Sequence, residues 1–435
     1  MSFLTRDPNA DLTFGVLSDL HMTHRGEGLQ KLNQYLALYS RVTPAIDAHV
    51  FAGDIVYQID ISGGGTCQEI YSEPYAYLKM AYERYAKDVP LVYAIGNHEY
   101  PQNRHDAEIN AEARALFEKE VGPLCQHTVL KGYHFITVGI QSWDCEFLEK
   151  DEEWAMTEIR RALRDSGDKP VFVVYHTPVN GTVIHSGGSR HSEKFAKFLT
   201  GNRRIVNICG HLHTPMQDPR NIWQKAGGAT VIHAPMSAVG NMPMTGSSKG
   251  GICGMFYSQS LFFEVTGTKI VIHKIDNLNE KEDGDPFVID VAGEQYYTKR
   301  RFTIAKKPAF PEGATAEAEY FRGLPHFRFP KAYVEATPGN ADSEVPIYRF
   351  DFYKKGEKTP AKSVTWHSDA MRSVHRDHFR SPVVVELEGG LYNVKITPIS
   401  FLGKEGRPIS AKLKMPEVQE KPMSWPFGSD MIGFV

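Results

Sequence analysis

Short apolar runs alternate with longer amphipathic segments along the first half of the chain. The runs at 12–17, 49–52, 90–95, 134–140, 170–175 and 205–209 have the length and apolar content of buried strands. Apolar residues recur at mostly helical spacing in the segments between them, which predicts helices over 28–45, 73–87, 106–121, 151–165 and 192–199. Strands and helices that alternate in this order predict an α/β layered domain.

The pattern changes in the second half of the chain. The polar, acidic segment 276–285 predicts the exit from the first domain. From residue 324, six short β-runs bounded by Gly, Pro and Asn predict a small antiparallel sandwich, at 332–336, 347–353, 363–367, 383–387, 392–398 and 409–413. We therefore expect a first domain over 1–285, a connecting segment over 286–323, an all-β domain over 324–415 and a C-terminal tail over 416–435.

Composition narrows the classes of partner. The 435 residues carry 49 Lys and Arg against 52 Asp and Glu, so the net charge of −3 provides no overall attraction to nucleic acid or anionic lipid. No apolar run reaches the roughly 18 residues of a membrane-spanning helix, and residues 1–11 lack the apolar core of a signal peptide. Five scattered cysteines without a CxxC pair favour a reducing compartment. We expect a cytoplasmic protein that acts on a small molecule, not on nucleic acid or a membrane.

Five polar blocks each follow a predicted strand directly. They are Asp19-Leu20-His21, Gly53-Asp54, Gly96-Asn97-His98-Glu99, His176 and Gly210-His211-Leu212-His213. The carboxyl ends of strands in α/β layers meet at a shared crevice, so these blocks are expected to converge. A single Asp or His after a strand most often caps a loop, but five blocks with ligands for transition metals favour a metal site. Seven candidate ligands exceed the needs of one ion, which favours a pair of metals suited to clamping phosphoryl oxygens.

Two local features of these blocks support close approach to an ion. In Asp-x-His and His-x-His, alternate residues of an extended chain share a face, so both side chains are expected to reach the same ion. The glycines before Asp54, Asn97 and His211 are expected to let the backbone turn sharply beside it.

The blocks and their order resemble the calcineurin-like metallophosphoesterase superfamily, which includes bacterial cyclic-nucleotide phosphodiesterases and purple acid phosphatases. The resemblance covers residues 12–275 and implies a four-layer α-β-β-α sandwich that binds two transition-metal ions, Mn, Fe or Zn. It implies one ion held by Asp19, His21 and His213, a second held by Asn97, His176 and His211, and Asp54 as the bridge. His98 matches the family's non-ligand histidine, which stabilises the transition state or protonates the leaving oxygen.

One position departs from the family pattern. Many members carry an Asp three residues after the bridging Asp, where it orients the acid histidine; here Tyr57 stands in that place, and Asp60 is a candidate substitute. Gly-Asp-x-x-Tyr also resembles the element whose Tyr ligates iron in purple acid phosphatases, whereas His21 is typical of the diesterases. We expect a phosphodiesterase acting on a small molecule such as a cyclic nucleotide. The alternatives are a phosphomonoesterase and a metal-binding scaffold without catalysis.

Further from the five blocks, the residues give weaker predictions. Arg190, His185 and His191 lie in a loop between two ligand blocks, where they either wall the substrate cleft or belong to a solvated surface loop. The all-β domain resembles a fibronectin type III domain in the spacing of its runs. That resemblance implies a domain that packs beside the catalytic one, shapes the cleft or mediates a homo-oligomer.

Overall fold

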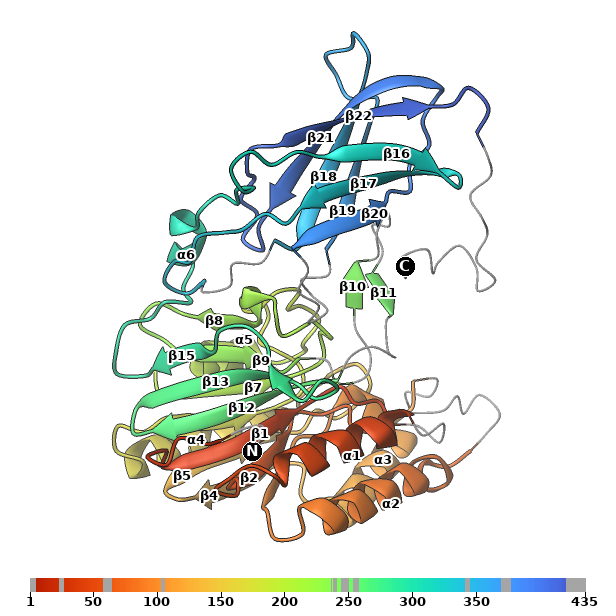
Figure 1. Cartoon of the computed structure of the whole chain (residues 1–435). Helices are drawn as coiled ribbons and strands as arrows, with labels where there is room; N and C mark the ends of the chain where they lie inside the picture. The colour runs from red at the N-terminus through yellow and green to blue at the C-terminus, as the bar shows by residue number, and fades with distance from the viewer. Residues whose placement is uncertain are drawn as a thin grey trace. The chain divides into compact units, whose positions relative to one another are not determined.

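The computed structural model describes residues 5–22, 27–57, 65–102, 106–235, 237, 241–243, 250–252, 258–340, 345–368 and 377–419. The chain divides into two compact units, and Figure 1 labels most of their helices and strands. The first unit comprises Met1–Gly240 and Cys253–Arg300, and the second comprises Asn241–Ile252 and Arg301–Val435. Each unit is described by itself below.

The first sheet of unit 1 has the strand order β14-β13-β12-β1-β2-β3, and β15 also pairs with β13. Its parallel part consists of β1 (Leu12–Leu17), β2 (Ala48–Phe51) and β3 (Leu91–Tyr93). The remaining strands run antiparallel to their neighbours: β12 (Gln259–Thr266), β13 (Lys269–Asp276), β14 (Lys281–Glu282) and β15 (Phe287–Asp290).

The second sheet of unit 1 has the order β4-β5-β6-β7-β9-β8. Four neighbouring strands are parallel: β5 (Tyr133–Thr137), β6 (Val171–Val174), β7 (Ile205–Cys209) and β9 (Thr230–His233). Antiparallel strands close the two edges: β4 (Gln126–Leu130) and β8 (Ile222–Gln224). The parallel strands of both sheets are almost wholly buried, which explains their continuous apolar runs.

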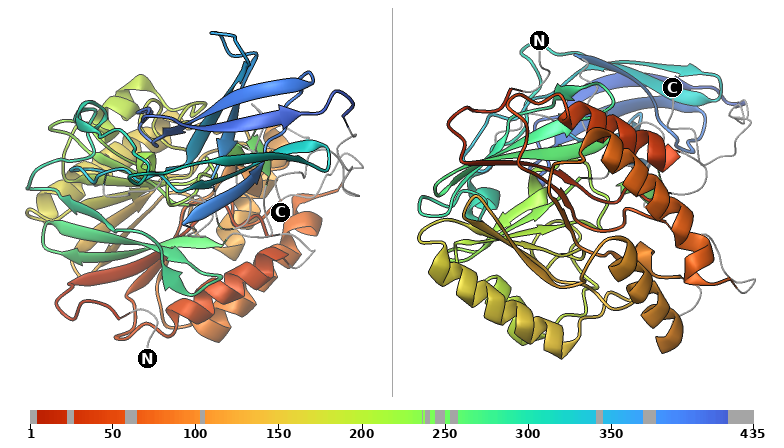
Figure 2. Two further views of the ribbon diagram at one scale, coloured as in Figure 1. Left: turned by 45° about the horizontal axis from the view of Figure 1, so that its top comes forward. Right: turned by 90° about the horizontal axis from the view of Figure 1, so that it is seen from below.

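Helices cover the outer face of each sheet, as Figure 2 shows. The first sheet packs against α1 (Glu27–Tyr39), α2 (Cys67–Tyr85) and α3 (Ala107–Glu120), and the second against α4 (Glu149–Asp165) and α5 (Glu193–Leu199). Between the sheets, the ring of Phe14 stacks on Phe263 at 4.6 Å and meets the edges of Phe135 and Phe172. This arrangement confirms the predicted four-layer α-β-β-α sandwich.

Helix α2 begins earlier than the sequence pattern predicts. Thr66 and Glu69 form a capping box, in which the side chain of each residue accepts a hydrogen bond from the backbone N–H of the other. Pro74 therefore lies inside the helix, not at its start. The predicted start at residue 73 therefore lies inside the helix, which begins at Cys67.

Unit 2 contains an antiparallel sheet of order β16-β17-β20 and another of order β19-β18-β21-β22. Their strands are β16 (Glu317–Phe321), β17 (Leu324–Pro330), β18 (Ile347–Lys354), β19 (Lys362–His367), β20 (His378–Pro382), β21 (Gly390–Ile399) and β22 (Ile409–Met415). Aromatic side chains fill the core: Phe327 and Phe329 face Tyr348 and Phe350 across 4.8–5.8 Å. The predicted C-terminal all-β domain is confirmed, while its fibronectin type III character stays a prediction.

Two predicted strands of this unit were wrong. Residues 332–336 contribute only an isolated bridge at Tyr333, and residues 383–387 have no regular structure, because the ladder to β17 is formed instead by β20 just before them. A short helix, α6 (Arg300–Ile304), and β16 precede residue 324. A separate pair, β10 (Asn241–Pro243) and β11 (Gly250–Ile252), also belongs to this unit. From residue 420 the predicted tail lies outside the described residues.

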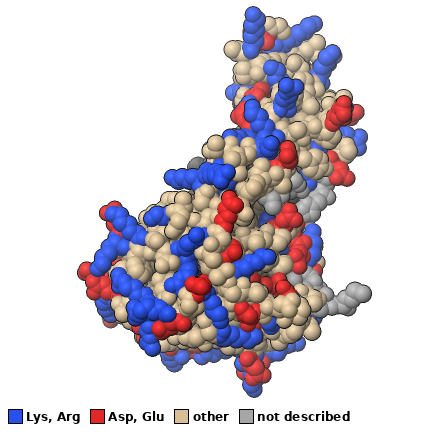
Figure 3. Space-filling view, turned by 90° about the vertical axis from the view of Figure 1, so that its left-hand side faces the viewer, with Lys and Arg blue, Asp and Glu red and all other residues tan. Residues whose placement is uncertain are grey.

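In the described part of the chain, none of the helices has both the length and the apolar character needed to cross a membrane. The four described cysteines, Cys67, Cys125, Cys145 and Cys209, form no disulfide. Basic and acidic side chains are interspersed on the face drawn in Figure 3.

His273 on β13 makes the stability of unit 1 depend on pH. Its Nε2 and Nδ1 each lie 3.0 Å from a carboxylate, of Glu264 and Glu282 respectively. Burial opposes protonation, but the hydrogen bonds to the two carboxylates raise the pKa of His273 to about 9. A histidine whose folded pKa lies above its unfolded value of about 6.5 stabilises fully below that value and loses the contribution as pH rises through 9.

We expect His273→Gln to lower the unfolding free energy by about 1–2 kcal/mol at about pH 6, because solvent screening weakens the two ion pairs. The difference from wild type is expected to shrink by about pH 10, where the imidazole is neutral in both states. Urea unfolding of both proteins at the two pH values measures it. A difference that is the same at both would contradict the charge-based explanation.

Candidate metal centre

The predicted ligands converge at the carboxyl edges of the parallel strands of both sheets. Asp19 and His21 follow β1, Asp54 follows β2, and Asn97 follows β3 in the short 3-10 helix η1 (Asn97–Glu99). From the second sheet, His176 follows β6, and His211 and His213 follow β7. All seven side chains are buried or nearly so. The predicted convergence is therefore present.

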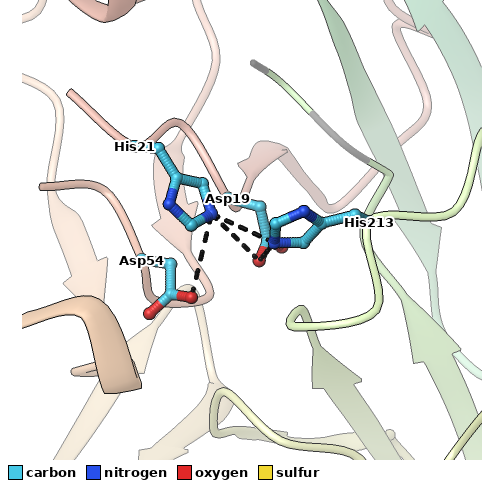
Figure 4. A group of neighbouring side chains, drawn as sticks. All are labelled: Asp19, His21, Asp54 and His213. Carbon is cyan, nitrogen blue, oxygen red and sulfur yellow. Dashed lines mark hydrogen bonds and ion pairs between the residues drawn. The ribbon is translucent and has the colours of Figure 1, made fainter. Parts of the chain in front are cut away.

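One cluster contains Asp19, His21, Asp54 and His213, which Figure 4 shows pointing toward one another. The Nε2 atoms of His21 and His213 are 3.0 Å apart, and that of His213 lies 3.1 Å from Asp19 Oδ1. His21 Nε2 is 3.9 Å from Asp19 Oδ1 and 3.9 Å from Asp54 Oδ2.

A second cluster contains Asp54, His176 and His211, and Asn97 lies within it. His176 Nε2 is 2.9 Å from Asp54 Oδ2 and 3.1 Å from Asn97 Oδ1. His211 Nδ1 lies 2.9 Å from the same amide oxygen. Asp54 belongs to both clusters, the position that a bridging carboxylate requires.

The donor atoms fit a cation better than they fit one another. His176 Nδ1 lies 2.7 Å from the carbonyl oxygen of Ala52, which only accepts, so in the neutral ring the proton sits on Nδ1 and Nε2 is a bare lone pair. That lone pair faces the oxygens of Asp54 and Asn97, and Asp54 Oδ2 accepts no hydrogen bond from any described residue. Buried lone pairs that face one another repel, and a positive charge between them, a proton or a metal ion, removes the repulsion. The residues therefore fit two metal ions.

The electrostatics of the site point the same way. Burial raises the pKa of Asp54, but His176 and His98 outweigh it and hold the pKa well below its ordinary value. Burial lowers the pKa of His176, yet Asp54 and Asp19 raise it to about 9. The two buried carboxylates thus stay ionised and attract positive charge, whether as protons or as metal ions.

The backbone adopts a left-handed conformation at most of the predicted ligands. Five predicted ligands have positive φ: Asp19 (54°), His21 (49°), Asp54 (52°), His211 (77°) and His213 (52°). Residues other than glycine rarely adopt this left-handed conformation, at a cost of about 1–3 kcal/mol each, and do so mainly at functional sites. The extended-strand explanation for Asp-x-His and His-x-His was therefore wrong, since β1 ends at Leu17 and β7 at Cys209. Left-handed turns, not strand alternation, bring each pair together.

Two glycines are required by this packing. Gly53 has φ of 92°, and a Cβ there would lie 2.5 Å from Nδ1 of His176. A Cβ on Gly96 would overlap both the carboxylate and the backbone nitrogen of Asp54. Side chains at either position would push ligand loops apart.

Glu99 supports the Asp54 loop, a role that the sequence analysis did not assign. Its Oε2 accepts hydrogen bonds from the backbone N–H groups of Asp54 (3.0 Å) and Gly96 (2.6 Å). Its Oε1 accepts from those of Ile55 (2.8 Å) and Val56 (3.1 Å) and from the hydroxyl of Tyr93 (2.9 Å). Burial and the charge of Asp54 raise the pKa of Glu99 to about 7, but five donors on its two oxygens fit only the carboxylate. An acidic residue inside a ligand block was the available signal.

His98 faces the clusters from an aromatic enclosure. Its Nε2 lies 3.9 Å from Asp54 Oδ2, its ring stacks on Tyr57 at 4.8 Å, and the edge of Trp143 meets it at 4.5 Å. The buried Nδ1 has no hydrogen-bond partner among the described residues. Burial lowers the pKa of His98. Asp60, the candidate orienting carboxylate, lies outside the described residues.

The three weaker predictions lie elsewhere in the loop that follows His176. Arg190 forms ion pairs with Glu146 (3.0 Å) and Asp144 (3.6 Å). His191 accepts a backbone hydrogen bond from Asn180 at 3.4 Å, and His185 is exposed with φ of 59°. Neither described metal cluster includes these residues. Their contact with substrate stays a prediction.

Residues 12–215 match the family model of the calcineurin-like phosphoesterases. This segment is a calcineurin-like phosphoesterase domain. It contains all seven predicted ligands and His98, so the chain is a phosphoester hydrolase with a candidate binuclear metal site. No curated protein matches the sequence.

Solved structures resemble the chain only weakly. PhoD has 12% identity and a TM-score of 0.40, covering 66% of this chain and 70% of its own. Purple acid phosphatase PPD1 from yellow lupin seeds has 12% identity and a TM-score of 0.42, covering 66% of this chain and 56% of its own. The 5′-nucleotidase precursor from Thermus thermophilus has 12% identity and a TM-score of 0.31, covering 93% of this chain and 89% of its own. Similarities this low carry no argument about activity.

Proposed function

We propose that the calcineurin-like phosphoesterase domain hydrolyses small-molecule phosphodiesters, with cyclic nucleotides as the first substrates to test. The observation that carries the proposal is the convergence of two ligand clusters on Asp54 with His98 beside them. The predicted ions, Mn, Fe or Zn, would be held by Asp19, His21, Asp54 and His213 on one side and by Asp54, Asn97, His176 and His211 on the other. When bound, such a pair supplies charge neutralisation at the phosphoryl oxygens and an activated water nucleophile.

The chain's own residues contribute binding geometry and one proton donor. The ligand loops fix the site at the edge of two buried sheets, so the donor atoms need little rearrangement before reaction. His98 directs Nε2 toward the clusters, where its proton lies within reach of a phosphoryl or leaving oxygen. Because Nε2 faces the clusters, we assign His98 the role of a hydrogen-bond donor to the transition state.

Two observations support a small diester over the alternatives. His21 lies inside the first cluster, as is typical of the diesterases that the sequence resembles, while the ring of Tyr57 stacks on His98. The net charge of −3 provides no overall attraction to nucleic acid. A small-molecule substrate fits both.

The test is a substrate panel with protein of measured metal content. Bis-p-nitrophenyl phosphate, p-nitrophenyl phosphate and cyclic nucleotides are offered to the Mn-loaded protein, and diesters are expected to be turned over faster than monoesters. Faster monoester cleavage would favour the phosphatase alternative. Full metal loading without hydrolysis of any compound would favour a non-catalytic scaffold.

The colour of the iron-loaded protein tests whether Tyr57 is a metal ligand, as in purple acid phosphatases, or not, as in the diesterases. If its phenolate ligates ferric iron, the iron-loaded protein will show a visible charge-transfer band, which Tyr57→Phe removes. We expect colourless ferric protein, because the ring of Tyr57 packs flat against His98, with 21° between the planes. A coloured protein would favour the purple acid phosphatase alternative.

Replacing His98 by Ala is expected to lower kcat about 10²-fold or more, the typical cost of one transition-state donor. The loss is expected to be similar for nitrophenyl and alkyl leaving groups, because a hydrogen bond to the phosphoryl oxygens does not depend on the basicity of the leaving oxygen. Kinetics on a series of aryl and alkyl diesters measure this, with His326→Ala on β17 of unit 2 as the control. A loss that grows with leaving-group pKa would instead establish His98 as a general acid.

A further inference from the structure

Beyond the predicted ligands, one buried histidine contacts the backbone between two of them. His233 is the last residue of β9, is 1% exposed and belongs to neither ligand cluster. β9 runs parallel to β7 with His233 in register with Cys209, which places its side chain beside the loop that begins two residues later with His211. His233 Nε2 lies 3.1 Å from the backbone nitrogen of Leu212.

The protons of this contact have only one consistent arrangement. The N–H of Leu212 can only donate, so His233 Nε2 must be a lone pair and the ring's proton sits on Nδ1. Nδ1 lies 3.1 Å from Thr214 Oγ1, and that hydroxyl is 2.5 Å from Asn221 Oδ1. Asn221 Nδ2 donates to the carbonyl of Pro215 at 2.7 Å, which fixes the amide with its oxygen toward Thr214. Each of these polar groups therefore has a partner, and the side chains of His233, Thr214 and Asn221 are all buried.

The loop held in this way is one of the strained ligand loops. Leu212 lies between His211 and His213, whose φ values of 77° and 52° are both left-handed. Such a conformation persists only where surrounding contacts determine it. Asp19 accepts from the N–H of His211 at 3.0 Å, but Asp19 is itself a predicted ligand. His233 holds the next peptide from outside the metal centre.

We propose that His233 is a positioning residue of the metal centre, which holds Leu212 so that His211 and His213 keep their left-handed turns and supply one ligand to each ion. The proposal rests on the proposed metal centre, but not on any particular substrate. Its chemistry is a neutral imidazole that accepts from Leu212 at Nε2 and donates to Thr214 at Nδ1. Partners of this kind typically contribute about 10–100-fold to metal affinity.

Two substitutions test the hydrogen bonds at Nε2 and Nδ1 of His233 separately. His233→Gln places an amide oxygen near the position of Nε2 and keeps an acceptor for Leu212. His233→Asn is too short to reach Leu212 and keeps only the donor to Thr214. We expect His233→Asn to weaken Mn²⁺ binding about 10–100-fold and His233→Gln to stay within about threefold of wild type.

Isothermal titration with Mn²⁺ alone measures these affinities without any substrate, so failure of the proposed hydrolysis would not affect the result. His49→Asn is the matched control, because His49 is also a buried histidine at a strand but its ring contacts Tyr35 and not the ligand loops. It is expected to lower the melting temperature and leave Mn²⁺ affinity unchanged. Wild-type Mn²⁺ affinity in a folded His233→Asn protein would overturn the proposal.

A measurement on the unmodified protein covers the case in which the variants do not fold. Nitrogen NMR of ¹⁵N-histidine-labelled protein reports which ring nitrogen carries the proton. His233 is expected to show a protonated Nδ1 and a bare Nε2, with the ring resonances assigned by through-bond correlation to the residue's own backbone amide. A proton on Nε2 would be incompatible with acceptance from Leu212 and would overturn the proposal.

Discussion

Asp54→Asn is expected to abolish binding of the second metal ion and to lower turnover of bis-p-nitrophenyl phosphate by about 10³-fold or more. Asp54 is the residue that both clusters share, and its Oδ2 lies 2.9 Å from His176 Nε2 and 3.9 Å from His21 Nε2. Asn removes the charge that neutralises two cations and offers only one oxygen. Metal content by mass spectrometry and steady-state kinetics in excess Mn²⁺ give the two readouts.

The substitution is conservative for the fold, which makes the result interpretable. Asp54 Oδ1 accepts from the N–H of His98 at 2.8 Å, and the amide oxygen of Asn retains that bond. Asp276→Asn is the matched control: this aspartate is 4% exposed and accepts from the N–H groups of Leu278 and Asn279, away from the clusters. The control is expected to keep full metal content and turnover. Full turnover of Asp54→Asn would refute the binuclear site.

The convergence of the candidate ligands was predictable because buried parallel strands are apolar along their whole length. A polar residue directly after such a run marks the edge of the sheet, and the edges of neighbouring parallel strands coincide. That reasoning places Asp19 beside Asp54 on the first sheet and His176 beside His211 on the second, without any knowledge of the helices. Errors of several residues in helix limits, such as the start of α2, therefore left the site prediction intact.

The supporting residues were harder to predict because they act through backbone groups. Glu99 and His233 accept from peptide N–H groups that carry no sequence signal, and left-handed turns decide which of these groups point inward. The run 231–233 ends in a histidine, much as the run 170–175 is followed by the predicted ligand His176. Only the observed geometry separates a histidine that faces the candidate metal clusters from one that faces a loop.

In unit 2, short apolar runs were not sufficient to predict which segments form strands. The apolar residues of 383–387 resemble those of a strand, yet the preceding segment His378–Pro382 pairs with β17. Val383 directly follows β20 and is buried in the core, but residues 383–387 pair with no other strand. Antiparallel sandwiches depend on pairings between distant segments, which the local pattern does not specify.

Glu99→Gln is expected to cost about 3–5 kcal/mol of stability, the largest effect we predict for a residue outside the ligand set. Both oxygens of Glu99 accept only from donors, so the amide nitrogen of Gln must face two or three N–H or O–H groups. Each donor left without an acceptor in this buried site carries its full desolvation cost. Urea unfolding followed by circular dichroism measures the loss.

The same substitution is expected to weaken Mn²⁺ binding, because Glu99 holds the N–H groups of Asp54 and Ile55 while Asp54 keeps its left-handed φ of 52°. Glu152→Gln is the matched control, since Glu152 is also a buried carboxylate, 4% exposed, but accepts from Ser192 at the start of α5. It is expected to lower stability and leave Mn²⁺ affinity unchanged. If Glu99→Gln and Glu152→Gln altered Mn²⁺ affinity equally, Glu99 would be a structural residue without a role at the metal centre. If only Glu99→Gln weakens binding, the strain in the Asp54 loop is maintained by a carboxylate that never contacts the ions.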